Sequence, residues 1–149
     1  MSGDVCGMLS NFRLQLVTQP EEELHASVAR LLDRLLLRPA QWTTFPAGNV
    51  PLPPRFAAKL ARLGLKRGWP DILVVFRRVH GIELKRKGGV LSKTRMTRLP
   101  SGAQRELRGQ ADVFPELEAA GMPIAVCRSP DDVVDALVEW GIPLRGRLA

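Results

Sequence analysis

The stretch GWPDILVVFRRVHGIELK, Gly68 to Lys85, decides the fold. After the Gly-Trp-Pro turn, residues 71–76 form a continuous apolar run, and residues 81–85 form a second run beyond Arg77 and Arg78. Short apolar runs that are rich in β-branched residues and bounded by turn residues are typical of buried strands. The two runs therefore predict adjacent strands, which the short connection joins into a hairpin.

Three charged residues interrupt these apolar runs. Asp71 opens the first run, and Glu83 and Lys85 lie two apart in the second, so their side chains project from one face. Buried ionised side chains cost several kcal/mol unless they pair with each other or bind a metal. Two carboxylates suit Mg²⁺ or Mn²⁺, and a nearby lysine can position a water or neutralise developing charge, which is what phosphodiester hydrolysis requires. The alternative for so short a pattern is an aspartate at a turn and an exposed Glu/Lys pair on an edge strand.

Helical patterns surround this hairpin. Thr18-Gln-Pro-Glu21 has the spacing of a capping box, and apolar residues then recur at helical intervals until Arg38-Pro39. Further along, Ser129 followed by Pro130 is a strong helix start. The other expected elements are a strand at 41–45, a helix at 55–63, a mobile polar loop at 86–102, a helix from Leu107 to Gly121 that Pro115 kinks or restarts, and a buried strand at 123–127.

The order of these elements predicts an α/β fold in which helices cover both faces of a mixed central sheet. With 149 residues and 45% apolar content, the chain is the size of one domain. We assign residues 18–149 to this domain and residues 1–17 to an N-terminal tail without an assigned function.

The composition indicates in which cellular compartment the protein works. Two cysteines and two histidines offer no spacing for structural zinc and no disulfide framework, which favours a reducing cytoplasm. No leader pattern and no apolar stretch of about 18 residues is present, so we expect a soluble cytoplasmic protein that does not enter a membrane.

Positive charge is concentrated in the middle of the chain. From Arg55 to Arg108 there are 15 Lys or Arg against three acids, a net charge of +12, whereas the rest carries −5. Such a field attracts a polyanion, although a merely solvated surface is the alternative. Aromatic residues are sparse, which favours contacts to phosphate over base stacking.

Several motifs occur in the order found in a known family. They are Glu21 at the start of the first helix, Phe45-Pro-Ala-Gly-Asn49, Gly64-Leu-Lys-Arg-Gly-Trp-Pro-Asp71, Gly81-Ile-Glu-Leu-Lys85, Gly109-Gln110, and Cys127-Arg-Ser129 before Asp131-Asp132. In this order, over roughly Pro20 to Leu144, the chain resembles the VRR-NUC family of the PD-(D/E)XK nuclease superfamily.

The resemblance implies a restriction-endonuclease-like core and a specific site. Asp71, Glu83 and Glu21 would bind Mg²⁺ or Mn²⁺ together with the carbonyl of Leu84. Lys85 would be the catalytic lysine. Two positions stay open, because a shift of one residue would exchange Glu21 for Glu22, and Gln104 competes with Gln110 as the glutamine that orients a water or the scissile phosphate.

The family members that it resembles act on DNA, and stand-alone forms cut branched DNA. We therefore expect a DNA endonuclease like a Holliday-junction resolvase, from a bacterial or phage context, with a homodimer as a plausible assembly. The alternatives are a non-catalytic DNA-binding protein on this fold, or an exonuclease or restriction-like enzyme. The segment Leu91 to Arg108 has no match in shorter members, and its basic residues, which include Arg105 and Arg108, are expected to contact the DNA backbone. The predicted DNA-binding residues are Lys66, Arg67, Arg86, Lys87, Lys93, Arg95 and Arg98.

Overall fold

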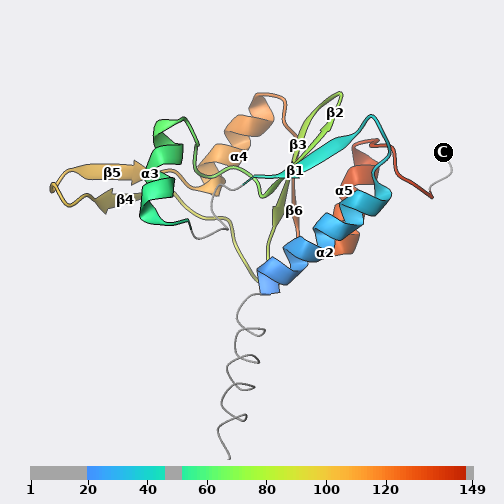
Figure 1. Ribbon diagram of the computed structural model, residues 1–149, viewed down its shortest axis with the longest axis horizontal. Helices are drawn as coiled ribbons and strands as arrows, with labels where there is room; N and C mark the ends of the chain where they lie inside the picture. Colours follow the sequence, from blue (N-terminus) through green and yellow to red (C-terminus); the bar gives the residue numbers. More distant parts are fainter. Residues whose placement is uncertain (1–19, 46–51, 147–149) are drawn as a thin grey trace, which may run out of the picture.

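A computed structural model describes residues 20–45 and 52–146 (Figure 1). The predicted tail, the Thr18 cap and the loop Pro46–Asn49 lie outside these ranges. No helix in the described ranges is long and apolar enough to cross a membrane. In chain order the elements are α2 (Pro20–Leu35), β1 (Gln41–Thr44), α3 (Pro54–Arg62), β2 (Ile72–Phe76), β3 (Arg78–Leu84), β4 (Arg95–Arg98), β5 (Gln104–Leu107), α4 (Gln110–Ala119), β6 (Ile124–Cys127) and α5 (Pro130–Glu139).

The central sheet has four strands in the order β1-β2-β3-β6. β1 pairs with β2 and β2 with β3 in antiparallel fashion, whereas β3 and β6 are parallel, so the sheet is mixed as predicted. The expectation that residues 123–127 form a buried strand was wrong in one respect. β6 is an edge strand, and only Cys127 is buried in it, because none of the described strands pairs with its outer side.

The β2–β3 hairpin confirms the prediction from the opening stretch. Its connection is the single residue Arg77, which has a φ of 60°, and the guanidinium lies 5.3 Å from the centre of the Phe76 ring. Phe76 pairs with Arg78 and Ile72 with Ile82. Continuing this register by one residue sets Asp71 opposite Glu83.

The two faces of the sheet have different covers. Ile72, Val74, Ile82 and Leu84 face the core, where they meet α2 and α5. Residues that alternate with them face the other way, and α4 covers that side, as Figure 1 shows and as a hydrogen bond between Gln110 and Glu83 requires. Helices therefore flank the sheet on both faces. The core cluster includes Val28 and Leu32 of α2 and Val133, Ala136 and Leu137 of α5.

α5 begins as the sequence predicts. Ser129 is the N-cap, its hydroxyl accepts a hydrogen bond from the Asp132 backbone N–H at 3.2 Å, and Pro130 follows in the first turn. The expected interruption of the preceding helix is absent. α4 continues through Pro115, its sixth residue, so the proline removes one intrahelical N–H donor but does not end the helix.

The segment expected as a polar loop at 86–102 is partly a strand. β4 pairs antiparallel with β5, with Arg95 opposite Leu107 and Arg98 opposite Gln104. The prediction missed this ribbon because its residues alternate without an apolar face. Together with α3 it projects away from the layer formed by α2 and α5 (Figure 1). We call α3 with the β4–β5 ribbon the arm.

Candidate active site

Asp71 is fixed at the start of β2 by the backbone of the neighbouring strand. Its Oδ2 accepts a hydrogen bond of 2.7 Å from the Leu84 N–H, and the residue is only 5% exposed. The side chain of Leu84 belongs to the core, so this residue reaches the site only through its backbone. The hairpin register thus places one carboxylate beside the end of β3.

Glu83 is the most deeply buried charged residue in the described part of the chain, with an exposed fraction of 0%. Its Oε1 lies 2.8 Å from Lys85 Nζ and accepts a 2.6 Å hydrogen bond from Gln110 Nε2. Its Oε2 is also buried, and no donor from residues 20–45 or 52–146 reaches it. Of the two Glu83 oxygens, Oε1 is therefore held by two donors, whereas Oε2 accepts no hydrogen bond from a described residue.

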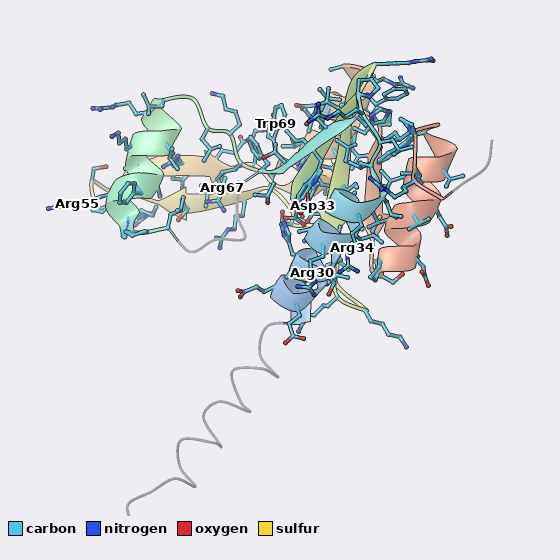
Figure 2. All side chains as sticks on the ribbon, turned by 45° about the vertical axis from the view of Figure 1, so that its right-hand side comes forward. Arg30, Asp33, Arg34, Arg55, Arg67 and Trp69 are labelled. Atoms are coloured by element: carbon cyan, nitrogen blue, oxygen red, sulfur yellow. The ribbon has the colours of Figure 1, made fainter. Side chains whose placement is uncertain are left out.

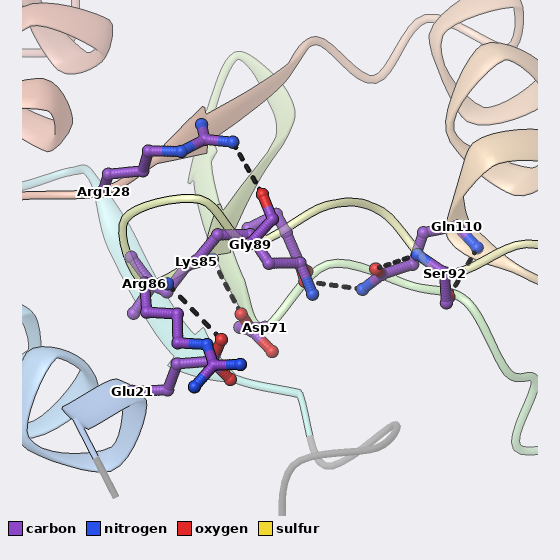
Figure 3. A network of polar contacts seen from close by, with 10 residues as sticks. Glu21, Asp71, Lys85, Arg86, Gly89, Ser92, Gln110 and Arg128 are labelled. Carbon is purple, nitrogen blue, oxygen red and sulfur yellow. Dashed lines mark hydrogen bonds and ion pairs between the residues drawn. The ribbon is translucent and has the colours of Figure 1, made fainter.

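Gln110 can present only its amide nitrogen to Glu83. The Ser92 backbone N–H, which is always a donor, points to Gln110 Oε1 at 3.3 Å. Ser92 also accepts from the start of α4, with its Oγ receiving the Gln110 N–H at 3.1 Å and its carbonyl the Ala111 N–H at 3.0 Å. These contacts fix the orientation of the Gln110 side chain (Figure 3).

Glu21 reaches the same neighbourhood from the first turn of α2. Its Oε1 accepts from the Arg86 N–H at 3.4 Å (Figure 3), and its charge contributes to raising the pKa of Asp71. Glu22, the open alternative, is exposed and makes no such contact in the described ranges. The register with Glu21 at the site is the one that the structure has.

Burial is the largest influence on the pKa of both carboxyls. It raises the pKa of Asp71, against the Leu84 N–H and the charge of Lys85, which lower it. Burial and then the charge of Asp71 raise the pKa of Glu83 to about 7, although Lys85 and Gln110 oppose this rise. Neighbouring buried carboxyls with raised pKa values are a recognised sign of a functional site.

The donor set fits a hard divalent cation. Asp71, Glu83 and Glu21 would supply carboxylate oxygens and Leu84 a carbonyl, which are the ligand types that Mg²⁺ and Mn²⁺ prefer. The unused lone pair of Glu83 Oε2 is what a cation would satisfy. Within residues 20–45 and 52–146, however, no three His, Cys, Asp or Glu side chains are close enough together to count as a preformed metal cluster, so the fit rests on two adjacent carboxylates with Glu21 nearby.

Among the glutamines and basic residues that the sequence predicts for the site, Gln110 and the backbone N–H of Arg86 contact these carboxylates. Gln104 is exposed in β5, whereas Gln110 contacts Glu83, so the structure brings Gln110 and not Gln104 to the site. Arg108, expected to contact DNA, makes two hydrogen bonds to the carboxylate of Glu116. All seven predicted DNA-binding residues are exposed: Lys66, Arg67, Arg86, Lys87, Lys93, Arg95 and Arg98.

Sequence reasoning missed two residues that support the site. Ser92 is 18 positions from Gln110, and no local pattern signals their contact. Arg128 follows β6, and its guanidinium donates to the Gly89 carbonyl at 2.8 Å, next to the Lys85–Arg86 segment (Figure 3). The pairing of β6 with β3 is what brings Arg128 next to Gly89.

His25 is linked to Asp71 through the hydroxyl of Thr44. Its Nε2 is 3.1 Å from Thr44 Oγ1, and that hydroxyl donates to the Asp71 carbonyl at 3.1 Å. Because a hydroxyl has one hydrogen, His25 Nε2 must be the donor in the first contact. Burial lowers the pKa of His25, and the charge of Glu83 works in the opposite direction.

The sequence matches no protein-family model, and no curated protein or solved structure is significantly similar to the chain. The resemblance to the VRR-NUC family therefore stays a prediction that depends on the quoted motifs.

Proposed function

We propose that the chain is a divalent-metal-dependent DNA endonuclease of the PD-(D/E)XK type, selective for branched DNA. The observation that carries the proposal is Glu83, a fully buried carboxylate beside Asp71 with one oxygen that no described donor reaches. The ion pair with Lys85 involves only one of the two oxygens and therefore does not explain why the second is buried without a donor.

Each residue of the site has a distinct task in this proposal. Asp71, Glu83, Glu21 and the Leu84 carbonyl would hold Mg²⁺ or Mn²⁺, which when bound supplies Lewis-acid activation of a phosphodiester and its attacking water. Gln110 keeps Glu83 in place through its 2.6 Å hydrogen bond. The Lys85 side chain is 15% exposed and its ammonium lies 2.8 Å from Glu83, so it is available to orient the water and to stabilise charge that develops on the phosphate.

The surrounding charge supports a nucleic-acid substrate. Arg86 and Lys87 follow Lys85 directly, and both are exposed. Exposed cations near the site favour phosphate contacts, which give affinity with little sequence preference. Selectivity for branched DNA comes from the family resemblance, and cutting a four-way junction on two strands would suit a two-fold symmetric dimer with two sites.

Cleavage assays on matched duplex, flap and four-way DNA with Mg²⁺ or Mn²⁺ test this proposal. Asp71→Asn and Lys85→Ala are each expected to lower the rate by at least about 10²-fold, since the first removes a proposed metal ligand and the second removes a cation beside the reacting phosphate. Asp135→Asn makes the same chemical change at an exposed position of α5 and is expected to leave the rate unchanged.

The outcomes separate the alternatives. Metal-independent cutting, or cutting that survives both site substitutions, would contradict the assigned site. Binding without cutting by every variant would favour a non-catalytic DNA-binding protein. Cutting of linear but not circular DNA would identify an exonuclease.

A further inference from the structure

The arm is the most strongly basic part of the molecule. Together with the residues that flank its elements, the arm spans residues 54–68 and 93–108, which contain ten Lys or Arg and one acid, Glu106. Of these ten, Arg108 is paired with Glu116 and Glu106, and none of the other nine forms an ion pair with a described acidic residue. These nine charges therefore have no partner within the described chain.

α3 adds a cationic face that sequence reasoning did not assign. Arg55, Lys59 and Arg62 recur at intervals of four and three, which places them on one side of the helix. α3 has no buried residue, so all three are exposed. An unpacked nine-residue helix with three cations on one side is poorly explained by a contribution to the core.

The ribbon lies beside this helix. Both views place α3 alongside β4 and β5 (Figures 1 and 2), and Figure 2 labels Arg55 at the end of the arm that lies away from α2 and α5. Arg95 and Arg105 occupy one face of the ribbon, because Arg95 pairs with Leu107 and Arg105 with Thr97. The arm thus has cations on α3 and on both strands of the ribbon.

The arm is firmly connected to the site through α4. Thr94 Oγ1 accepts the Gly109 N–H at 2.9 Å and donates to Asp112, while Ser92 binds Gln110. A Cβ on Gly109 would lie 2.3 Å from the Lys93 carbonyl carbon, which shows how closely the two segments pack. These contacts hold the start of the ribbon next to Gln110, which contacts Glu83.

We propose that the arm is a docking surface for the phosphate backbone of double-stranded DNA. This inference deepens the proposed function, on which it rests, by specifying a substrate whose duplex continues beyond the bond to be cut. Charge complementarity identifies the ligand as a polyanion. Phe56 is the one aromatic residue in the described arm, so a stacking platform for single strands is absent from it.

Binding measurements in EDTA test the docking surface without cleavage. The probes are labelled duplexes of about 30 bp and about 10 bp, three helical turns and one. The variant carries Arg55→Gln, Lys59→Gln and Arg62→Gln. The control carries the same charge change at exposed positions away from the arm, with Arg34→Gln, Arg38→Gln and Arg145→Gln.

The slope of log Kd against log salt is the readout. Each lost phosphate contact lowers the slope by about 0.9, so the α3 variant is expected to lose about 2 to 3 on the long duplex. The short duplex should show a smaller difference, and the control should match the wild type on both. Circular dichroism of the α3 variant checks that the fold is retained.

Equal slopes for wild type, control and α3 variant on the long duplex would overturn the inference. Failure of the nuclease proposal can be distinguished from failure of the docking surface. A wild type that binds through the arm but never cuts would leave the docking surface intact, and cutting that ignores the α3 variant would leave only the nuclease.

Discussion

Glu83 combines two demands that conflict in the absence of a cation. Its position in β3 between Ile82 and Leu84 excludes water, while Asp71 adds a second negative charge nearby. Lys85 and Gln110 offset part of this cost at one oxygen only. We interpret the remaining cost as stability given up for a site that is ready to bind a cation.

The raised pKa of Glu83 leads to a prediction about pH. Because the folded-state pKa of about 7 exceeds the ordinary 4.5, folding favours the protonated acid. The resulting stability is fully present below pH 4.5 and is lost as the pH rises through 7. Metal-free wild type should therefore lose several degrees of Tm between pH 5 and pH 8, and Glu83→Gln should lose less, which thermal melts at both pH values would measure.

The control for this experiment is Glu139→Gln, an exposed change near the end of α5 that should follow the wild type. If Glu83→Gln melted with the same pH dependence as the wild type, the buried carboxyl would not be the titrating group.

The segment from Ser92 to Thr94 replaces the N-cap that α4 lacks. Gly109, the N-cap residue, has no side chain to accept the first N–H groups. Ser92 Oγ and the Ser92 carbonyl accept two of them instead. A contact between distant segments thus performs a task that is usually local, and it fixes Gln110 as a consequence.

We predict that Ser92→Ala lowers both stability and cleavage. Loss of a helix-capping hydroxyl costs about 0.5–2 kcal/mol, and a freer Gln110 would hold Glu83 less well. Chemical denaturation measures the first effect, and the cleavage rate in Mg²⁺ measures the second. Ser101→Ala, a hydroxyl deletion at the exposed turn of the ribbon, should change neither. A Ser92→Ala protein with the stability and the cleavage rate of the wild type would contradict the assigned role.

The whole molecule divides its work between two faces of one sheet. α2 and α5 bury the apolar face, whereas the opposite face carries Asp71 and Glu83 under the start of α4. The arm extends from this second side and contributes no residue to the core cluster. Stability and the proposed chemistry are therefore supplied by different layers.

Leucine truncations test this division. Leu137→Ala in α5 removes a side chain with an exposed fraction of 0% and should cost about 2–5 kcal/mol. Leu63→Ala, just after α3, removes one that is 70% exposed and should stay within about 0.5 kcal/mol. Urea denaturation of both variants measures the difference, and equal losses would mean that α3 packs against the core.

Local pattern determined much of this protein. Apolar runs predicted the β2–β3 hairpin, turn and cap residues predicted α5, and the spacing of Asp71, Glu83 and Lys85 predicted that they share a site. Each of these follows from backbone periodicity or from a neighbour within a few residues, which a sequence displays directly.

Contacts between distant segments were decided only by the tertiary structure. The β4–β5 ribbon lacks an apolar face, so β4 was predicted as part of a loop, and Leu107, the last residue of β5, was wrongly predicted to begin a helix. The capping of α4 by Ser92, the approach of Glu21 rather than Glu22, and the choice of Gln110 over Gln104 all depend on pairings across the fold. A side chain's long-range partner depends on how whole elements pack, and local periodicity does not encode that packing.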